Sequence, residues 1–242
     1  LNPFFSIMIF LAILCGIGGA VLMSNAKGEG LEVRGNAYFT AALVLVGVVI
    51  VVGWPLFYIF HEQIFVFFGA DAENLPYVLA YGKWLVLFYP MFVLPTFLGA
   101  FLRNDGAPGL ATLGVVTGGV FNIFGDWYFC FPLGMGMEGA AIATVSGTTI
   151  QAAIMGTHFL RRGKCHLHLV WPKKVLADMR RIVTLGFGAG VLDFGNVLIA
   201  IIINNQIMRY GGVEALSVYG VVGTISLLFQ ALFGGVGQAV QP

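Results

Sequence analysis

Long apolar runs, each about the length of a membrane-spanning helix, follow one another along almost the whole chain. A helix needs about 20 apolar residues to cross a hydrocarbon core of roughly 30 Å. Seven such windows lie at about 2–23, 38–60, 79–102, 110–131, 139–160, 182–208 and 214–237. Because they are apolar on nearly every face and do not alternate, they predict helices and not the strands of a barrel. The expected fold class is all-α, a polytopic membrane helix bundle with about seven transmembrane helices.

The composition agrees with an integral membrane protein. Of the 242 residues, 59% are hydrophobic and only 10% are charged, which is more apolar surface than one soluble core of this size could bury. The formal net charge of +1 gives no reason to expect nucleic acid as a partner. The cysteines show no CxxC pair or metal-ligand spacing, so we expect Cys15, Cys130 and Cys165 to be small apolar fillers.

The basic residues indicate which side of the membrane each connection occupies. Of the 12 Lys and Arg residues, all except Lys83 and Arg209 fall on one side when the connections are assigned alternately. Cytoplasmic loops carry an excess of Lys and Arg, so this side is predicted to be cytoplasmic. The longest connection, 161–181, is a basic cytoplasmic linker between five spans in 1–160 and two spans in 182–242.

Two features of this linker carry expectations of their own. Its end, "KKVLADMRRI", is amphipathic and is expected to lie along the membrane surface, with its basic residues against anionic headgroups. His166 and His168 lie in an exposed basic strip without nearby carboxylates, so we expect solvated side chains and no metal site. The chain begins at Leu1 and stops at Pro242 directly after a hydrophobic segment, and we expect it to be a fragment.

Two acidic residues, Asp126 and Asp193, fall well inside apolar windows. An Asp at the centre of a membrane helix costs roughly 2.5 to 3.5 kcal/mol on insertion scales. Such a residue is usually turned toward a polar cavity or a partner, so both are candidates for function.

Asp126 has polar neighbours at matching positions. Asn122 lies one helical turn earlier on the same face, and Thr144 stands as far after residue 135 as Asp126 stands before it, so a hairpin places them at one depth. Carboxylate, amide and hydroxyl oxygens suit a small cation such as Na⁺, and the carboxylate can alternatively hold a proton. The alternative is that Asp126 only hydrogen-bonds a neighbouring helix to fix packing.

A substrate cavity has four candidate residues. Asp193 and Asn196 share an unusually polar helix that could line a water-filled path, although Asp193 could instead pair with Arg180 or Arg181. Trp127 and Tyr128 could form part of a pliable apolar wall, although such rings in a bilayer more often face lipid.

Five stretches carry a recognisable pattern, in order, over nearly the whole chain: 16–40, 99–129, 131–147, 204–222 and 233–242. They include the elements LR-x-DG-x-P, N-x-x-x-D and GM-x-GAA-x-AT. Together they resemble the multidrug and toxic compound extrusion (MATE) transporters. The resemblance implies a fold of twelve helices in two lobes, with this chain supplying N-lobe helices two to six, the linker and the first two C-lobe helices.

The resemblance also implies site residues. In the family, an N-lobe cation site combines an acid of the first helix with an Asn and an Asp of the fifth and a Thr of the sixth, which fall on Asn122, Asp126 and Thr144. Gly188 stands where many members have a proline, and a further acidic position falls near Asn196. Coupling is therefore expected to rest on the N-lobe.

The expected function is secondary active antiport: multidrug efflux of amphipathic, cationic organic compounds in exchange for Na⁺ or H⁺. We expect no enzyme activity and no cofactor besides the coupling ion. The expected partners are a small organic substrate and the lipid bilayer, with a monomeric, multi-pass protein in the plasma membrane of bacterial inner-membrane type. One alternative is a flippase of lipid-linked saccharides, which would need basic residues deep in the spans. An intramembrane aspartyl protease would need Asp126 and Asp193 at one depth, yet they lie toward opposite ends of their spans.

Overall fold

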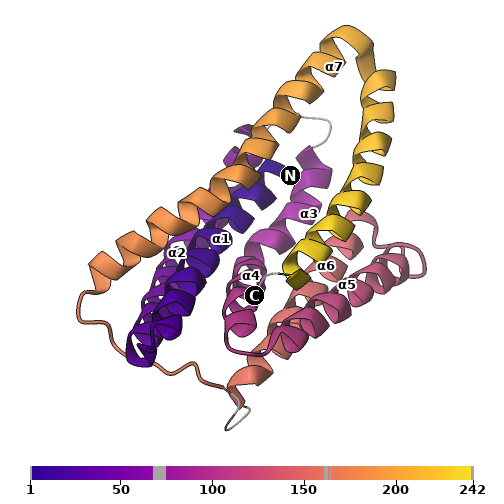
Figure 1. The fold of residues 1–242 in the computed structure, drawn as a ribbon. Coiled ribbons are helices and arrows are strands. Elements are labelled where there is room, and N and C mark those ends of the chain that lie inside the picture. The colour runs from indigo at the N-terminus through magenta and orange to yellow at the C-terminus, as the bar shows by residue number, and fades with distance from the viewer. Residues whose placement is uncertain (1, 68–74, 161–162, 164, 241–242) are drawn as a thin grey trace. The chain divides into compact units, whose positions relative to one another are not determined.

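The computed structural model describes residues 2–67, 75–160, 163 and 165–240. For residues 2–3 and many positions of the last helix beyond Val191, it describes the backbone alone. The described residues form helices and no strand, which confirms the all-α fold class (Figure 1). The helices are α1 (Asn2–Gly28), α2 (Glu32–Phe67), α3 (Leu75–Leu87), α4 (Tyr89–Asn104), α5 (Pro108–Cys130), α6 (Gly136–Gly156), the 3-10 turn η1 (Thr157–Leu160) and α7 (Val175–Val240).

The chain divides into two compact units, Leu1–Phe194 and Gly195–Pro242. The first contains α1 to α6, η1 and the beginning of α7, and the second contains the rest of α7. By length and composition, α1, α2 and α5 could each cross a membrane, and the α3–α4 pair would be a fourth span if it is counted as one.

The window 79–102, predicted as one span, is a broken helix. The break falls between Leu87 and Tyr89, and α3 and α4 meet there at 55°. Pro90 stands in the first turn of α4, where a backbone N–H has no partner within the helix and proline is tolerated. In the middle of one continuous helix the same proline would remove a hydrogen bond, which explains why the helix breaks here.

The last two predicted spans lie within one helix. The two windows predict a connection at 209–213. The helical assignment of α7 continues through all its 66 residues, while Figure 1 shows its ribbon changing direction between the orange and the yellow arm. The two consecutive glycines there weaken a helix without removing a backbone donor as proline does. A straight helix of this length would measure about 100 Å, far more than a bilayer core, so the division of 182–242 into two spans stays a prediction.

Aromatic side chains fill the space between α1, α2 and α4. Phe101 of α4 meets Phe39 of α2 edge-on with ring centroids 5.1 Å apart, and it contacts Phe97 at 4.9 Å. All three rings are buried. Gly19 of α1 leaves room for the Phe101 ring, because a Cβ at this position would lie only 2.8 Å from the ring. These contacts hold the first unit together next to the α5–α6 hairpin.

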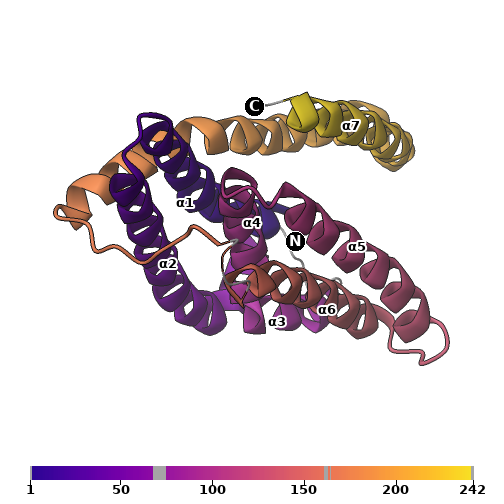
Figure 2. The ribbon, with the colours of Figure 1, turned by 60° about the horizontal axis from the view of Figure 1, so that its bottom comes forward.

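The α5–α6 hairpin is the tightest helix pair of the first unit (Figure 2). Its turn contains Gly134 and Gly136, which have φ of +61° and +55°, a left-handed conformation that glycine adopts without strain. At the crossing, a Cβ on Gly118 would lie 2.6 Å from the Gly147 carbonyl oxygen, and the reverse distance is also 2.6 Å. Only glycine at both positions allows this approach.

Substitution Gly118→Ala should therefore force the two helices apart. Overpacking a tight contact costs about 1–3 kcal/mol, and we expect a lower thermal midpoint for the full-length protein in detergent, read from intrinsic fluorescence. Gly119→Ala is the matched control, since no atom lies within 4 Å of a Cβ there. Equal midpoints for the two variants would contradict the close crossing.

Candidate functional site

Three polar side chains from three helices meet at Thr144 of α6. The Thr144 hydroxyl donates to the carbonyl oxygen of Ala140 at 2.9 Å, which uses its one proton. Its oxygen therefore accepts from Asn122 Nδ2 of α5 at 3.2 Å and from the Tyr81 hydroxyl of α3 at 3.1 Å. The expected proximity of Asn122 and Thr144 is thus present in the structure, and Tyr81 completes the cluster.

This bonding pattern fixes the direction of the Asn122 amide. Because the Thr144 proton is already donated, only the amide nitrogen can face Thr144, and the amide oxygen of Asn122 points elsewhere. That oxygen is the one available to a ligand. Thr144 could bind a cation itself only by releasing Asn122 or Tyr81, so in this conformation Thr144 orients the site.

Asp126 lies one helical turn beyond Asn122 on α5 and is half-buried. Its Oδ1 atom is buried and has no hydrogen-bond partner within the described part of the chain. None of the described polar contacts joins Asp126 to Asn122 or Thr144. A buried carboxylate oxygen without a described partner is costly, so Asp126 stays a candidate for holding a proton or a small cation.

Of the other predicted cavity residues, Trp127 and Tyr128 make no described contact with this cluster. Trp127 and Tyr128 are 55% and 42% exposed, and both rings contact Phe124 on their own helix, at 5.8 and 6.1 Å. Asp193 and Asn196 belong to α7, but their side chains lie outside the described residues.

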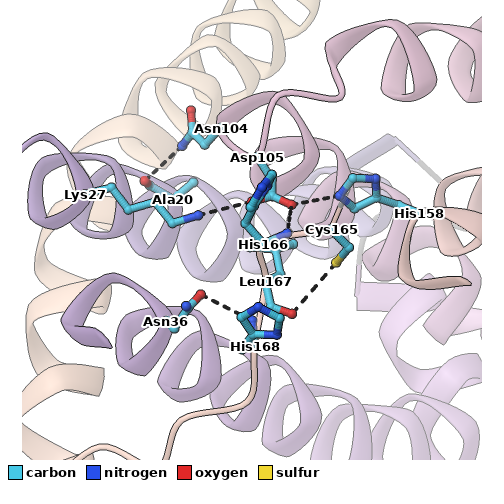
Figure 3. A network of polar contacts seen from close by, with 10 residues as sticks. All are labelled: Ala20, Lys27, Asn36, Asn104, Asp105, His158, Cys165, His166, Leu167 and His168. Carbon is cyan, nitrogen blue, oxygen red and sulfur yellow. Dashed lines mark hydrogen bonds and ion pairs between the residues drawn. The ribbon is translucent and has the colours of Figure 1, made fainter. Parts of the chain in front are cut away.

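The sequence did not point to Tyr81 or to a second polar group around Asp105. The Asp105 carboxylate, which directly follows α4, binds three partners (Figure 3). Oδ1 accepts from Lys27 Nζ at 3.1 Å, while Oδ2 lies 2.8 Å from His158 Nε2 and accepts from the His166 backbone N–H at 2.9 Å. The side chains of Asp105 and His158 are 1% and 2% exposed. Asp105 lies inside the LR-x-DG-x-P element, which was the available signal.

Burial alone would raise the pKa of the Asp105 carboxyl. The hydrogen bonds from His158, His166 and Lys27, together with the charge of Lys27, hold that pKa below its ordinary value. The network therefore favours an ionised carboxylate that ties the last turn of α1, η1 and the linker together.

Asp105, His158 and Cys165 place their donor atoms within 4.8 Å of one another, an arrangement that some metal sites share. Both carboxylate oxygens already have partners, and the Cys165 thiol points to the Leu167 carbonyl oxygen at 3.8 Å. We therefore assign this group a structural role. The His166 ring is 70% exposed, as expected, but its Nδ1 atom lies 3.9 Å from Asp105 Oδ1, so the expectation that no carboxylate lies near it is wrong.

Helices that are long and apolar enough to cross a membrane, with a polar cluster between them, indicate an integral membrane protein. The MatE family model matches residues 1–128, more than half of the chain, and the chain belongs to this family. A curated relative, the multidrug export protein MepA of Staphylococcus saprophyticus, is 26% identical over 245 residues, which cover 99% of this chain and 53% of that protein. The chain thus spans about half the length of the curated relatives it matches.

Two solved structures share the fold. They are the outward-facing and inward-facing conformations of a multidrug resistance MATE family transporter of the MOP superfamily, with TM-scores of 0.82 and 0.80. Each is 22% identical to this chain. The match to the outward-facing structure covers 94% of this chain and 51% of that one, and the match to the inward-facing structure covers 93% and 52%. This likeness confirms a helical membrane bundle of MATE type.

The Asp105 network makes a prediction about stability. Asp105→Asn leaves Lys27 without its carboxylate, and breaking a buried pair costs about 3 kcal/mol, so the thermal midpoint at pH 7 should fall. Because the pKa of Asp105 is lower in the folded state, its stabilisation is present above the unfolded pKa of about 3.9 and is lost as the pH falls through the folded value. The difference between variant and wild type should therefore shrink only in acid.

The control is Glu29→Gln, which removes an exposed acid from the turn that carries Lys27. It should leave the thermal midpoint unchanged across the same pH series. An Asp105→Asn protein as stable as this control at pH 7 would refute the structural role of the network.

Proposed function

We propose that this chain provides the cation-coupling part of a secondary active antiporter that exports amphipathic, cationic organic compounds in exchange for Na⁺ or H⁺. The observation that supports it is the buried Asp126 Oδ1 without a partner, one turn from an Asn122 amide whose oxygen is free. The MepA relatives are multidrug export proteins, and we propose the same activity for the full-length protein. The proposed location is the plasma membrane of a bacterium.

The coupling follows from the electrostatics of one carboxylate. Away from water, Asp126 gains free energy by taking up either a proton or a cation, because each neutralises its charge. The two cannot occupy the same oxygen together, so they compete. If the substrate prefers the conformation with a charged Asp126, uptake of the ion from outside lowers substrate affinity there and promotes release.

The roles of the remaining residues follow from their bonds. Asn122 would supply the second ligand oxygen, and Thr144 and Tyr81 would hold its amide in the required direction. Trp127, Tyr128, Asp193 and Asn196 remain candidates for the substrate cavity. We propose transport without catalysis, a monomer, and no cofactor beyond the coupling ion.

The test uses the full-length protein in proteoliposomes loaded with ethidium, an organic cation. Efflux is driven by a Na⁺ gradient in one set and by a pH gradient in the other. Asp126→Asn should abolish gradient-driven efflux and hold ethidium affinity at the low value of the ion-bound state, because the amide stays neutral whatever the ion concentration. Glu138→Gln, which removes an acid paired with Lys83 at the start of α6, should retain efflux. Gradient-driven efflux by Asp126→Asn at the wild-type rate would eliminate the proposed mechanism.

A milder substitution tests the orienting bond. Thr144→Val cannot accept the Asn122 amide proton, so the amide loses its fixed direction. The loss of one hydrogen bond of about 1 kcal/mol predicts an about fivefold higher ion concentration for half-maximal efflux. Thr149→Val is the control, since the Thr149 hydroxyl bonds the Val145 carbonyl oxygen of its own helix. An unchanged ion dependence in Thr144→Val would remove Thr144 from the site.

A further inference from the structure

A basic pocket lies on the predicted cytoplasmic side of the first unit, away from the Asp126 region. It has a volume of about 850 Å³ and is formed by the start of α2, the linker and the start of α7. Figure 2 shows the linker passing alongside α2 toward α7. The beginning of α7 is seated against α1, because a Cβ on Gly18 would lie 2.2 Å from the Ile182 carbonyl oxygen. The pocket walls are therefore fixed by helix packing.

Two arginines converge inside this pocket on one phenol. The buried Tyr38 hydroxyl accepts from Arg34 Nη2 at 2.9 Å and from Arg181 Nη1 at 3.3 Å. The Arg34 guanidinium also lies over the Tyr38 ring, 5.0 Å from its centroid. Tyr38 thus holds two positive groups close together, an arrangement that their mutual repulsion opposes.

The acids of the pocket do not balance these charges. Asp178 Oδ1 lies 3.4 Å from Arg34 Nη2, and Arg181 has no carboxylate partner among the described residues. Of the pocket-lining residues, Lys173 and Lys174 add two more positive charges, while Glu32 adds the second acid. The pocket lining thus carries two more basic than acidic side chains, and paired guanidinium groups match the oxygens of a phosphate.

Apolar side chains border the same pocket. Trp171 and Val33 line it and are each 72% exposed, and Leu31 lines it and is 49% exposed. Tryptophan is enriched at the membrane–water interface. A free phosphate would use the basic groups but would leave these side chains uncovered, whereas a phospholipid covers both.

We propose that this pocket binds the headgroup phosphate of an anionic phospholipid of the cytoplasmic leaflet, with Arg34 and Arg181 as its ligands. Basic pockets at the cytoplasmic ends of membrane helices bind such headgroups. The bound lipid connects α2 to the linker and α7, and it covers the exposed Trp171. This site is independent of the proposed transport reaction.

The test measures the thermal midpoint of the full-length protein in detergent and its lipid adducts by native mass spectrometry. Phosphatidylglycerol should raise the midpoint and remain bound, whereas phosphatidylcholine and inorganic phosphate at equal concentration should do neither. Arg181→Gln should lower phosphatidylglycerol adducts about tenfold while leaving the Arg34–Asp178 pair intact. Arg181→Lys should give an intermediate loss, because it retains the charge without the planar fork.

Arg103→Gln is the matched control, since it removes an exposed charge from the same predicted side and outside the pocket. It should bind phosphatidylglycerol like the wild type. Equal adducts in Arg181→Gln and Arg103→Gln would overturn the proposal. Stabilisation by inorganic phosphate to the same extent would overturn it in favour of a free anion, and equal binding of phosphatidylcholine would show that the charge is not recognised.

Discussion

The close approach of two backbones at Gly118 and Gly147 is the constraint on which the polar cluster depends. Asn122 lies one turn after Gly118 on α5, and Thr144 lies about one turn before Gly147 on α6. Both side chains are short, and they reach one another at 3.2 Å only because no Cβ separates the helices at the crossing. Larger residues at the crossing would separate Asn122 from Thr144 and leave both side chains in apolar surroundings without their shared hydrogen bond. The close packing of the two helices is therefore a condition for the polar contact.

Much of this arrangement could be predicted from the sequence. The apolar windows located α1, α2, α5 and α6. The symmetry of the hairpin about residue 135 placed Asp126 and Thr144 at one depth, whereas the hydrogen bond to Thr144 comes from Asn122, one turn before Asp126. Tyr81 could not be found this way, because it enters from α3, whose position depends on the break before Pro90. The Asp105 network was missed for a similar reason: its partners lie 53 to 78 residues away in the chain, and no periodic pattern links them. The paired glycines at 211–212 do not interrupt the helical assignment of α7, although Figure 1 shows the α7 ribbon changing direction between its orange and yellow arms.

Two aspartates in this chain illustrate how the environment divides structural from functional roles. Both Asp105 oxygens have donors, one of them a lysine, so the charge is neutralised within the protein and has no need of a ligand. Asp126 has a buried oxygen with no described donor. Hydropathy alone could have singled out only Asp126, because Asp105 lies in a connection. The hydrogen-bond partners of the two carboxylates, and not their depth in the membrane, indicate that Asp105 stabilises the fold and leave Asp126 as the candidate ion ligand.

The break between α3 and α4 has a mechanical consequence. α3 is fastened to α6 twice, by Tyr81 to Thr144 and by Lys83 to Glu138, whereas its junction with α4 at Phe88 has no continuous helical ladder to resist bending. α6 packs against α4 as well as against α3, so the break lets α3 leave the axis of α4 and reach a helix that both of them contact. The hydroxyl of Tyr81 therefore arrives at Thr144 through a bend in the chain, and the proposed ion site depends on that bend.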